Sequence, residues 1–154
     1  MSIEVVGGDQ IEDWTLDVIV TGLSSDAHTW NLVYLQLLLE ELGCRVTNLG
    51  GCVPDETIVR ECLARRPDLV VISSLNGHGC QDGLRLIEAV RASPALAATP
   101  FVIGGKLDVV AGSSAGRLLT AGFNAVFEDD GGLSPFRCFV HALAVRAAAP
   151  IGVR

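Results

Sequence analysis

Residues 16–30 read LDVIVTGLSSDAHTW, and this stretch sets the pattern that the rest of the fold follows. The apolar, β-branched run at 18–20 predicts a buried strand over residues 16–21. A polar loop comes next, and from Trp30 onward apolar residues recur at helical spacing until Gly43 ends the helix. A buried strand, a polar loop and a helix in this order are typical of parallel strands joined by helical connections.

The same order of elements repeats along the rest of the chain. Further strands are predicted at residues 44–49, 69–72, 100–103 and 125–127, and further helices at 54–66, 82–91, 113–121 and 134–148. Five such units joined by short turns predict an α/β fold with a single doubly wound, five-stranded parallel sheet and helices on both faces. The common strand order of such a sheet is 2-1-3-4-5. Residues 1–14 have mixed character and predict a flexible leader, so the domain comprises residues 15–154.

Composition restricts the classes of protein and of partner. Hydrophobic residues make up 49% of the chain and aromatic residues only 5%, so Val, Ile, Leu and Ala should form the core, as in buried parallel strands. A net charge of −7 argues against nucleic acid or an anionic membrane surface as the main partner. No apolar run reaches the ~18 residues of a membrane span, and there is no signal-peptide pattern. The five cysteines include no Cys-x-x-Cys pair, which favours reduced thiols in a cytoplasmic protein.

Three polar or glycine-rich loops follow predicted strands one, three and four. They comprise residues 24–30, 73–79 and 104–106. Because the carboxyl ends of parallel strands lie at one edge of the sheet, these loops should lie together where open α/β sheets bind ligands. The turns at the opposite edge carry no comparable chemistry. The sequence therefore predicts a ligand site at the carboxyl edge of the sheet.

The first of these loops places Asp26 two residues before His28. Such a carboxylate can hold one imidazole nitrogen and leave the other as a base or a metal ligand. On spacing alone, the alternative that His28 is a polar loop residue without a ligand stays open. A dinucleotide or nucleotide-phosphate site is poorly supported, because no Gly-x-Gly-x-x-Gly or Gly-Lys-Ser motif is present. A receiver domain would carry an Asp where the third strand ends in Ser73-Ser74.

Three motifs in order resemble the cobalamin-binding domain family. They are Ser25-Asp26-Ala27-His28-Thr29, Ser73-Ser74-Leu75-Asn76-Gly77 and Gly104-Gly105, against a family signature of Asp-x-His-x-x-Gly, Ser-x-Leu and Gly-Gly. Within that family the chain is most similar to the small (sigma) subunit of glutamate mutase, also called methylaspartate mutase. The resemblance covers about residues 16–130 and implies a flavodoxin-like, Rossmann-like cobalamin-binding fold.

The resemblance implies adenosylcobalamin as the cofactor, with His28 coordinating cobalt and Asp26 orienting its imidazole. The displaced nucleotide tail of the cofactor would enter a slot between the first helix and the sheet. Residues 73–75 would line this slot, and Gly104-Gly105 would let the backbone approach closely. The implied cofactor-binding residues are Ser25, Asp26, Ala27, His28, Thr29, Ser73, Ser74, Leu75, Gly104, Gly105 and Lys106.

The chain departs from the family pattern at two places. Asn31 stands where the signature has its Gly after the His, with Trp30 beside it. Asn adopts unusual backbone angles more readily than most residues, so it is a mild replacement. Residues 129–132 read Asp-Asp-Gly-Gly where the similar family segment has Pro-Gly-Thr. Two acidic side chains near the tail slot would change how it fits the cofactor.

The resemblance implies the cobalamin-binding subunit of an adenosylcobalamin-dependent carbon-skeleton mutase, an isomerase acting on glutamate, 3-methylaspartate or a similar amino acid. A separate large subunit would hold the substrate, and the chain alone would be inactive. Two alternatives stay open: a cobalamin or corrinoid carrier or sensor without mutase activity, and a domain that has kept the fold but lost the ligand. Methyl carriers of this superfamily usually have a helical cap domain, which a leader of about 15 residues cannot supply.

Overall fold

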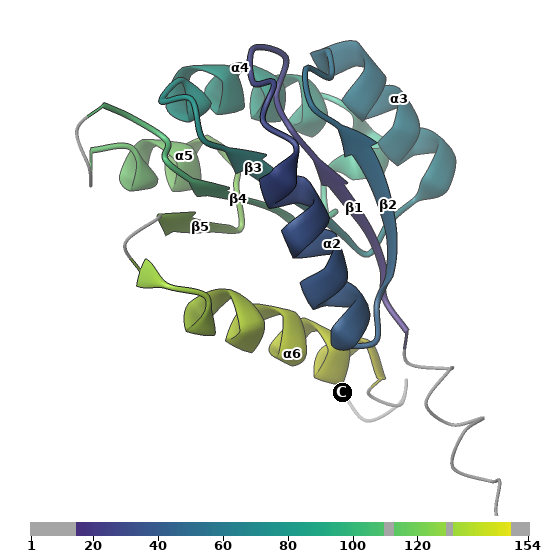
Figure 1. Ribbon diagram of the computed structural model, residues 1–154. Helices are drawn as coiled ribbons and strands as arrows, with labels where there is room; N and C mark the ends of the chain where they lie inside the picture. The colour runs from purple at the N-terminus through teal and green to yellow at the C-terminus, as the bar shows by residue number, and fades with distance from the viewer. Residues whose placement is uncertain (1–14, 110–112, 129–130, 149–154) are drawn as a thin grey trace, which may run out of the picture.

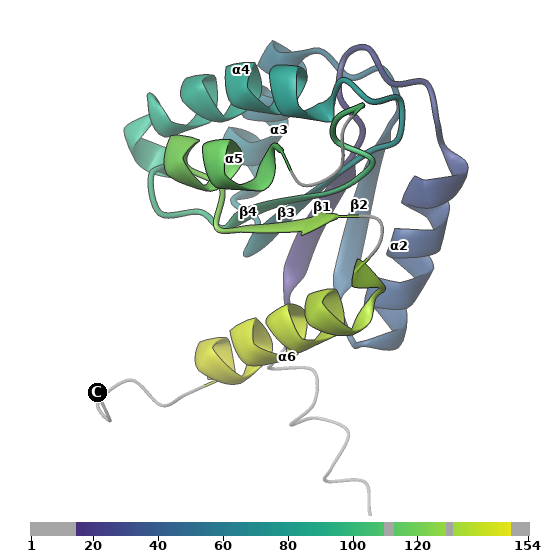
Figure 2. The ribbon, with the colours of Figure 1, turned by 90° about the vertical axis from the view of Figure 1, so that its left-hand side faces the viewer.

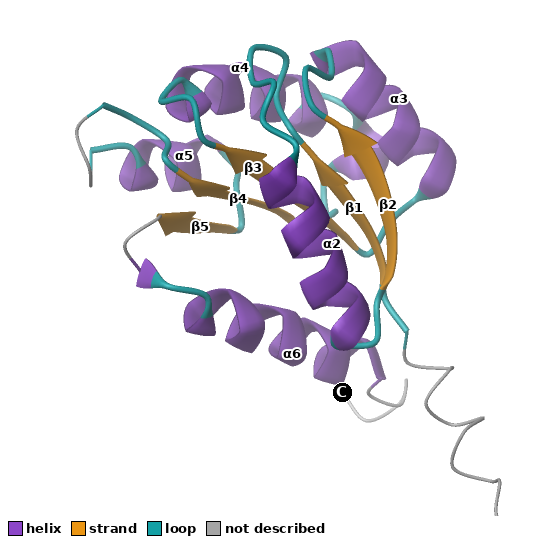
Figure 3. Ribbon diagram, viewed as in Figure 1, coloured by secondary structure: helices purple, strands orange, loops and turns teal. Residues whose placement is uncertain are grey.

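The computed structural model describes residues 15–109, 113–128 and 131–148, and it contains the five predicted strands (Figure 3). They are β1 (Asp17–Thr21), β2 (Arg45–Gly50), β3 (Leu69–Ser74), β4 (Phe101–Gly105) and β5 (Ala125–Glu128). All of the strand pairs are parallel, and the strand order is β2-β1-β3-β4-β5. The predicted sheet and its strand order are therefore confirmed. The order in which strands are added to the sheet reverses between β1 and β3, which makes this the switch point of the fold.

The helices form two layers, one on each side of the sheet. They are α2 (Trp30–Glu41), α3 (Asp55–Arg65), α4 (Gly79–Arg91), α5 (Ala115–Ala121) and α6 (Ser134–Ala148), with a short 3-10 helix, η1, at Pro94–Leu96. Figures 1 and 2 show α3, α4 and α5 on one face of the sheet and α2 and α6 on the other. The doubly wound arrangement is therefore confirmed. Within the described part of the chain, no helix is long and apolar enough to cross a membrane.

The two central strands extend further than predicted. β3 continues through Ser73 and Ser74, and β4 continues through Gly104 and Gly105, all of which were predicted to lie in loops. The register explains the extension, because Ser73 pairs with Gly104 and Ser74 pairs with Gly105. The prediction ended each strand with its last apolar residue, whereas backbone pairing continues through these small residues.

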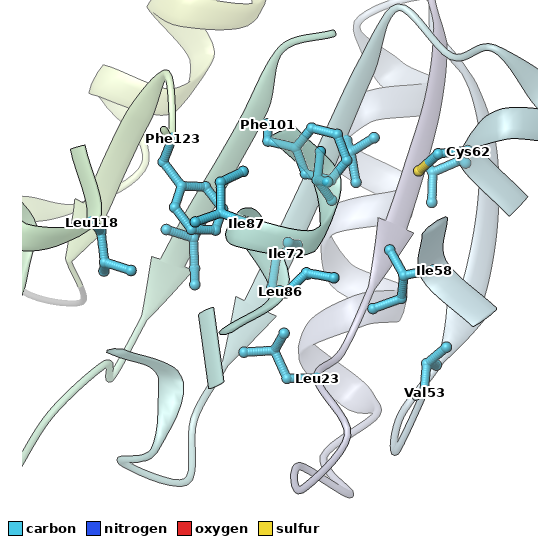
Figure 4. Packing of buried hydrophobic residues seen from close by; sticks show 14 of the residues in the cluster. Leu23, Val53, Ile58, Cys62, Ile72, Leu86, Ile87, Phe101, Leu118 and Phe123 are labelled. Carbon is cyan, nitrogen blue, oxygen red and sulfur yellow. The ribbon is translucent and has the colours of Figure 1, made fainter. Parts of the chain in front are cut away.

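One face of the sheet is filled by a large apolar core, hereafter the closed face. Figure 4 shows side chains of α3 and α4 gathered against the sheet, among them Ile58, Leu86 and Ile87 around Ile72 of β3. All four of these side chains have no measurable exposure to solvent. Such burial of branched side chains on both strand and helix is the main stabilising contribution to this fold.

The other face, hereafter the pocket face, is packed against α2 and α6. Val71 and Val102 from the central strands lie with Leu32 and Leu39 of α2 and with Phe136 of α6 in a second apolar cluster. Phe136 also meets Phe127 of β5 edge to face, with ring centroids 5.5 Å apart and an angle of 81°. This packing holds α6 beneath β5, but it leaves the carboxyl end of the face open.

Candidate functional site

His28 and Asp26 form the carboxylate–imidazole pair that their spacing allows. The His28 ring nitrogen Nδ1 lies 2.6 Å from Oδ1 of Asp26, in a loop that joins β1 to α2. Because a carboxylate only accepts, this contact places the ring proton on Nδ1 and leaves Nε2 with its lone pair. The His28 side chain is 55% exposed, whereas that of Asp26 is 1% exposed. A buried acid thus orients an imidazole that is accessible to a ligand.

Asp26 is held by backbone donors from two loops. Its Oδ1 accepts the N–H of His28 at 3.0 Å, and its Oδ2 accepts the N–H groups of Leu75 at 2.6 Å and Asn76 at 3.2 Å. Burial alone would raise the pKa of Asp26, but these hydrogen bonds and the His28 ring together lower the pKa below its usual value. The carboxylate is therefore ionised and fixed, as an orienting group requires.

A network of charged and polar groups fixes the residues just before this pair. Ser25 donates its hydroxyl to Asp82 of α4 at 2.5 Å, and the Asn76 amide donates to the Ser25 carbonyl at 3.0 Å. Arg85, one turn further along α4, donates to Asp82 at 3.1 Å and to Ser24 at 3.0 Å. The loop that carries His28 is thus tied to the start of α4 on the closed face.

An apolar pocket of about 260 Å³ opens on the pocket face, beside this loop. Its walls come from α2, from the carboxyl ends of β3, β4 and β5, and from the start of α6. The lining residues are Asn31, Tyr34, Leu35, Val71, Ile72, Ser73, Leu75, Val102, Ile103, Gly104, Gly105, Phe127, Glu128, Gly132, Leu133 and Phe136. Most of these side chains are apolar. Polar side chains lie where α2 meets β3, and the carboxylate of Glu128 lies at the end of β5. An occupant with a flat apolar part and a polar end would suit these walls.

Asn31 and Ser73 meet across one end of the pocket. The Asn31 amide nitrogen donates to the Ser73 hydroxyl at 2.6 Å, which joins the first turn of α2 to β3. The amide oxygen of Asn31 is buried and has no hydrogen-bond partner among the described residues. A buried polar atom of this kind normally has a hydrogen-bond partner.

Gly104 and Gly105 are required by the sheet itself. A Cβ atom on Gly104 would lie 2.7 Å from the carbonyl oxygen of Phe127 in β5. A Cβ on Gly105, where φ is +109°, would lie closer still to the carbonyl oxygen of Ser74 in β3. The glycines therefore allow close approach of neighbouring strands, and both also line the pocket.

Most of the predicted cofactor-binding residues line the pocket or lie in the loop beside it. Ser73, Leu75, Gly104 and Gly105 line the pocket, while Ser25, Asp26 and His28 lie in the loop beside it. Ala27 and Thr29 are exposed in the same loop, and Thr29 precedes α2 without a side-chain capping bond. Their contacts with a cofactor stay predictions.

Two predicted residues do not reach the pocket. Ser74 is buried on the closed face, where a Cβ on Gly79 would lie 2.8 Å from its Cβ and Oγ. Ser74 therefore does not line this pocket together with Ser73, because consecutive strand residues point to opposite faces, and its contact with a cofactor stays a prediction. Lys106 is exposed outside the pocket lining, and its backbone N–H donates to the Ser74 carbonyl. Asp129 and Asp130, expected near the tail slot, lie outside the described residues.

Several participating residues were not predicted from the sequence. Asn76 was quoted only as part of a motif, yet it contacts both Ser25 and Asp26. Asp82 and Arg85 have i, i+3 spacing on α4, but nothing in that spacing indicates that they reach the first loop. Val71 and Val102 could have been found, because they alternate with residues that face the opposite way along their strands.

The cysteines carry no metal site in this structure. Among the described residues, no group of three or more His, Cys, Asp or Glu side chains could hold a metal ion. Burial raises the pKa of Cys62 to about 12 and that of Cys44 to about 11, so both remain protonated thiols. Cys80, predicted to lie in a loop, is buried at the start of α4, and Cys52 and Cys138 are the exposed ones.

The fold and the site together define a class of protein. A doubly wound domain with an oriented histidine and an apolar pocket at its carboxyl edge is a ligand- or cofactor-binding domain. The family described as the B12 binding domain matches residues 16–126 of the chain. The chain therefore belongs to the B12 binding domain family, as its motifs predicted, and this membership supports cobalamin as the cofactor.

Two curated relatives share part of the sequence. The glutamate mutase sigma subunit of Halobacterium salinarum is 34% identical over 92 residues, which is 60% of this chain and 60% of that protein. The HTH-type transcriptional repressor CarA of Myxococcus xanthus is 34% identical over 83 residues, which is 53% of this chain and 28% of the repressor. The chain thus spans less than two thirds of the length of either relative.

Solved structures agree with the fold. A cobalamin-binding protein from Desulfitobacterium hafniense DCB-2 superposes with a TM-score of 0.69 at 17% identity, covering 83% of this chain and 58% of that one. A putative response regulator from Chloroflexus aurantiacus J-10-fl superposes with a TM-score of 0.65 at 19% identity, covering 86% of this chain and 99% of that one. Since proteins of two kinds superpose almost equally well, this likeness supports the fold alone.

Proposed function

We propose that this chain is the cobalamin-binding subunit of an adenosylcobalamin-dependent carbon-skeleton mutase that acts on glutamate, 3-methylaspartate or a similar amino acid. The observation that carries the proposal is the pair of Asp26 and His28, with Nδ1 held at 2.6 Å and the ring 55% exposed. Similarity to a glutamate mutase sigma subunit supports the reaction class. A separate large subunit would hold the substrate, as in the resemblance to glutamate mutase, and the chain alone would be inactive.

The residues present suit cobalamin in two respects. His28 would coordinate cobalt through Nε2, and Asp26 would hold the imidazole in the required tautomer and raise its basicity. The apolar pocket beside it would take the displaced nucleotide tail. Bound adenosylcobalamin supplies the homolysis of a cobalt–carbon bond that begins radical rearrangements. The protein's own contribution is to bind, to orient and to exclude water from the tail.

An exposed apolar stripe on α2 supports a partner subunit. Trp30 is 84% exposed, Tyr34 54% and Leu37 59%, and their spacing places them on one side of the helix. Exposed large apolar groups in a row are typical of protein interfaces. The stripe begins two residues after His28, so a large catalytic subunit seated there would also cover the cobalt. We assign the stripe to that subunit.

A second candidate function is a cobalamin-dependent sensor or carrier module without mutase activity. The similarity to the repressor CarA favours it, because that relative is a transcriptional regulator and not a mutase subunit. The same Asp26–His28 pair would serve either function. Only the partner would differ, namely a regulatory domain in place of a catalytic subunit.

Cobalt ligation by His28 can be tested with cob(II)alamin bound to ¹⁵N-labelled protein. The electron paramagnetic resonance spectrum should show a superhyperfine doublet, because a ¹⁵N nucleus of the protein would be the axial ligand. A triplet from the ¹⁴N of the cofactor's own base would contradict the assignment. His28→Ala should lose the doublet, and His78→Ala should keep it, since His78 is exposed at the same edge without belonging to the pair.

The mutase reading requires a second experiment. The chain loaded with adenosylcobalamin should convert glutamate to 3-methylaspartate only after addition of a glutamate mutase large subunit, and Trp30→Ala should weaken that complex. Cobalt ligation without rearrangement with any candidate large subunit would favour the sensor or carrier function instead.

A further inference from the structure

Arg85 of α4 joins three elements of the fold near the candidate site. Its guanidinium donates to Asp55 at the start of α3 at 2.6 and 3.3 Å, and to Asp82 of α4 at 3.1 Å. It also donates to the Ser24 hydroxyl, in the loop between β1 and α2 that carries His28, at 3.0 Å. The planar fork of five donors in an arginine side chain suits such a three-way contact.

Asp82 extends the reach of Arg85 to the next residue of that loop. The Asp82 residue is only 7% exposed, and its two carboxylate oxygens have different partners. One oxygen accepts from Arg85, and the other accepts the Ser25 hydroxyl at 2.5 Å. Burying a carboxylate costs free energy unless it is paired, so Arg85 supplies the charge that lets Asp82 hold Ser25.

The loop after β2 holds the same loop from another side. The carbonyl oxygen of Asp26 accepts the backbone N–H of Cys52 at 2.8 Å, and a Cβ atom on Gly51 would lie 3.0 Å from that oxygen. This second loop leads into α3, where Asp55 binds Arg85. Arg85 therefore ties together the segments that fix the backbone on the N-terminal side of His28.

We propose that Arg85 is a positioning residue for the cobalt ligand, because its contacts hold the loop after β1 so that His28 is ready to ligate before a corrinoid binds. The inference rests on the proposed function, since it concerns the ligation of cobalt by His28. A ligand on a loop that must first be ordered loses part of its binding free energy to that ordering. Arg85 removes this cost by acting through Ser24 and Asp82.

Hydrogen exchange of the ligand-free protein tests the positioning without any cofactor. Arg85→Met removes the guanidinium but keeps a long, unbranched side chain. The backbone N–H groups of Cys52 and Leu75, which both donate to Asp26, should exchange about tenfold faster, the effect of losing one charge-assisted hydrogen bond. The N–H of Val70, inside the sheet, should keep its rate.

Arg65→Met is the matched control. Arg65 is 51% exposed, against 49% for Arg85, and it forms an ion pair with Glu61 of its own helix. The control therefore removes an equally exposed cation that does not join α3 to the loop after β1. It should leave the exchange of Cys52 and Leu75 unchanged.

Cobalt ligation supplies a second readout, from the spectrum of cob(II)alamin bound to ¹⁵N-labelled protein. In the complex separated from free cofactor, the wild type should show only the ¹⁵N doublet. Arg85→Met should show the doublet together with the triplet of the cofactor's own base, and its dissociation constant for adenosylcobalamin should rise about tenfold. A residue needed only for stability would change the amount of folded protein but not the ratio of doublet to triplet.

Ser24→Ala tests the same contact without leaving the buried Asp82 unpaired. It removes the hydroxyl that Arg85 binds in the loop but keeps both ion pairs of Arg85. It should move exchange and affinity in the same direction as Arg85→Met, by a smaller factor. This variant decides the question if Arg85→Met does not fold.

The outcomes distinguish this inference from the proposed function. Unchanged loop exchange and a pure doublet in Arg85→Met would overturn the inference while leaving ligation by His28 intact. Faster exchange of Val70 as well as of the loop would also overturn it, because Arg85 would then stabilise the whole fold. If the wild type shows no ¹⁵N doublet, the proposed function fails and the inference fails with it, whatever the exchange rates of the loop.

Discussion

The two faces of the sheet are built from the same strands but are filled differently. On the closed face, Gly79 lets the start of α4 press against Ser74 at the carboxyl end of β3. On the pocket face, the hydroxyl of the neighbouring residue Ser73 accepts a hydrogen bond from the Asn31 amide, and a pocket of about 260 Å³ remains. The start of α4 therefore packs directly against β3 on the closed face, whereas a pocket remains beside the contact of α2 with β3 on the pocket face.

The candidate site is held in place by hydrogen bonds to both sides of the sheet. The orienting residue Asp26 binds the His28 ring and the backbone N–H of Leu75, and Leu75 lines the pocket. The loop itself is tied through Ser25 to Asp82 on the closed face. Contacts with the well-packed closed face thus support the candidate site beside the pocket face. A preorganised binding site requires such support.

The largest effect is expected from Gly105→Ala, which would separate β3 from β4 where both faces end. The new Cβ would overlap the carbonyl oxygen of Ser74, and φ of +109° is strained for any residue with a side chain. Unfolding in urea should show a loss of about 3 kcal/mol or more. Gly116→Ala is the control, because a Cβ on this α5 residue meets nothing within 4 Å and should stabilise by roughly 0.5–1 kcal/mol. Equal stability of both variants would contradict the close approach of the strands.

The next largest effect is expected from Asp26→Ala, which removes the carboxylate that joins the loop after β1 to the loop after β3. The N–H groups of His28, Leu75 and Asn76 would lose their acceptor, at a total cost of about 2–3 kcal/mol. Urea denaturation measures this loss, and Asp26→Asn, which keeps one oxygen, should lose less. A larger loss in Asp26→Asn than in Asp26→Ala would contradict this account of the donors.

The lowered pKa of Asp26 also predicts a pH dependence. Since its pKa is lower folded than unfolded, the carboxylate's contribution is fully present above the unfolded value of about 3.9 and is lost as pH falls through the folded pKa. Wild-type stability should therefore fall more steeply than that of Asp26→Asn below pH 4. Parallel curves for the two proteins would contradict an ionised, hydrogen-bonded Asp26.

The fold could be predicted from the sequence, but only part of the site could be. The apolar runs and glycine boundaries predicted the strands, and the spacing of Asp26 and His28 predicted their contact. The contact between Asn31 and Ser73 spans 42 residues and depends on where α2 meets β3, which no local pattern determines. The resemblance implied that Ser73 and Ser74 both line the slot, but the extended strand β3 turns their side chains to opposite faces.

A matched pair of deletions should measure the difference in packing. Val70 and Val71 are consecutive in β3, with Val70 on the closed face and Val71 at the pocket. Val70→Ala should cost about 2 kcal/mol, because it leaves a cavity in a filled core. Val71→Ala should cost about 1 kcal/mol, because its side chain already borders empty space. Equal losses in urea unfolding would show that the pocket face is packed as tightly as the closed face.

The smallest expected effect on stability comes from adding a methylene, and its size should differ between the two faces. Val70→Ile adds a methylene to the filled core of the closed face and should destabilise the fold by about 1 kcal/mol. Val102→Ile adds the same methylene toward the pocket and should change the free energy of unfolding by less than about 0.5 kcal/mol in either direction. The same methylene should weaken binding of adenosylcobalamin by Val102→Ile but leave binding of adenosylcobinamide, which lacks the nucleotide, unaffected, since only the nucleotide tail would need that space. Val70→Ile should bind both corrinoids as the wild type does. If Val102→Ile bound adenosylcobalamin normally, the tail would lie elsewhere, and the pocket face would owe its opening to packing alone.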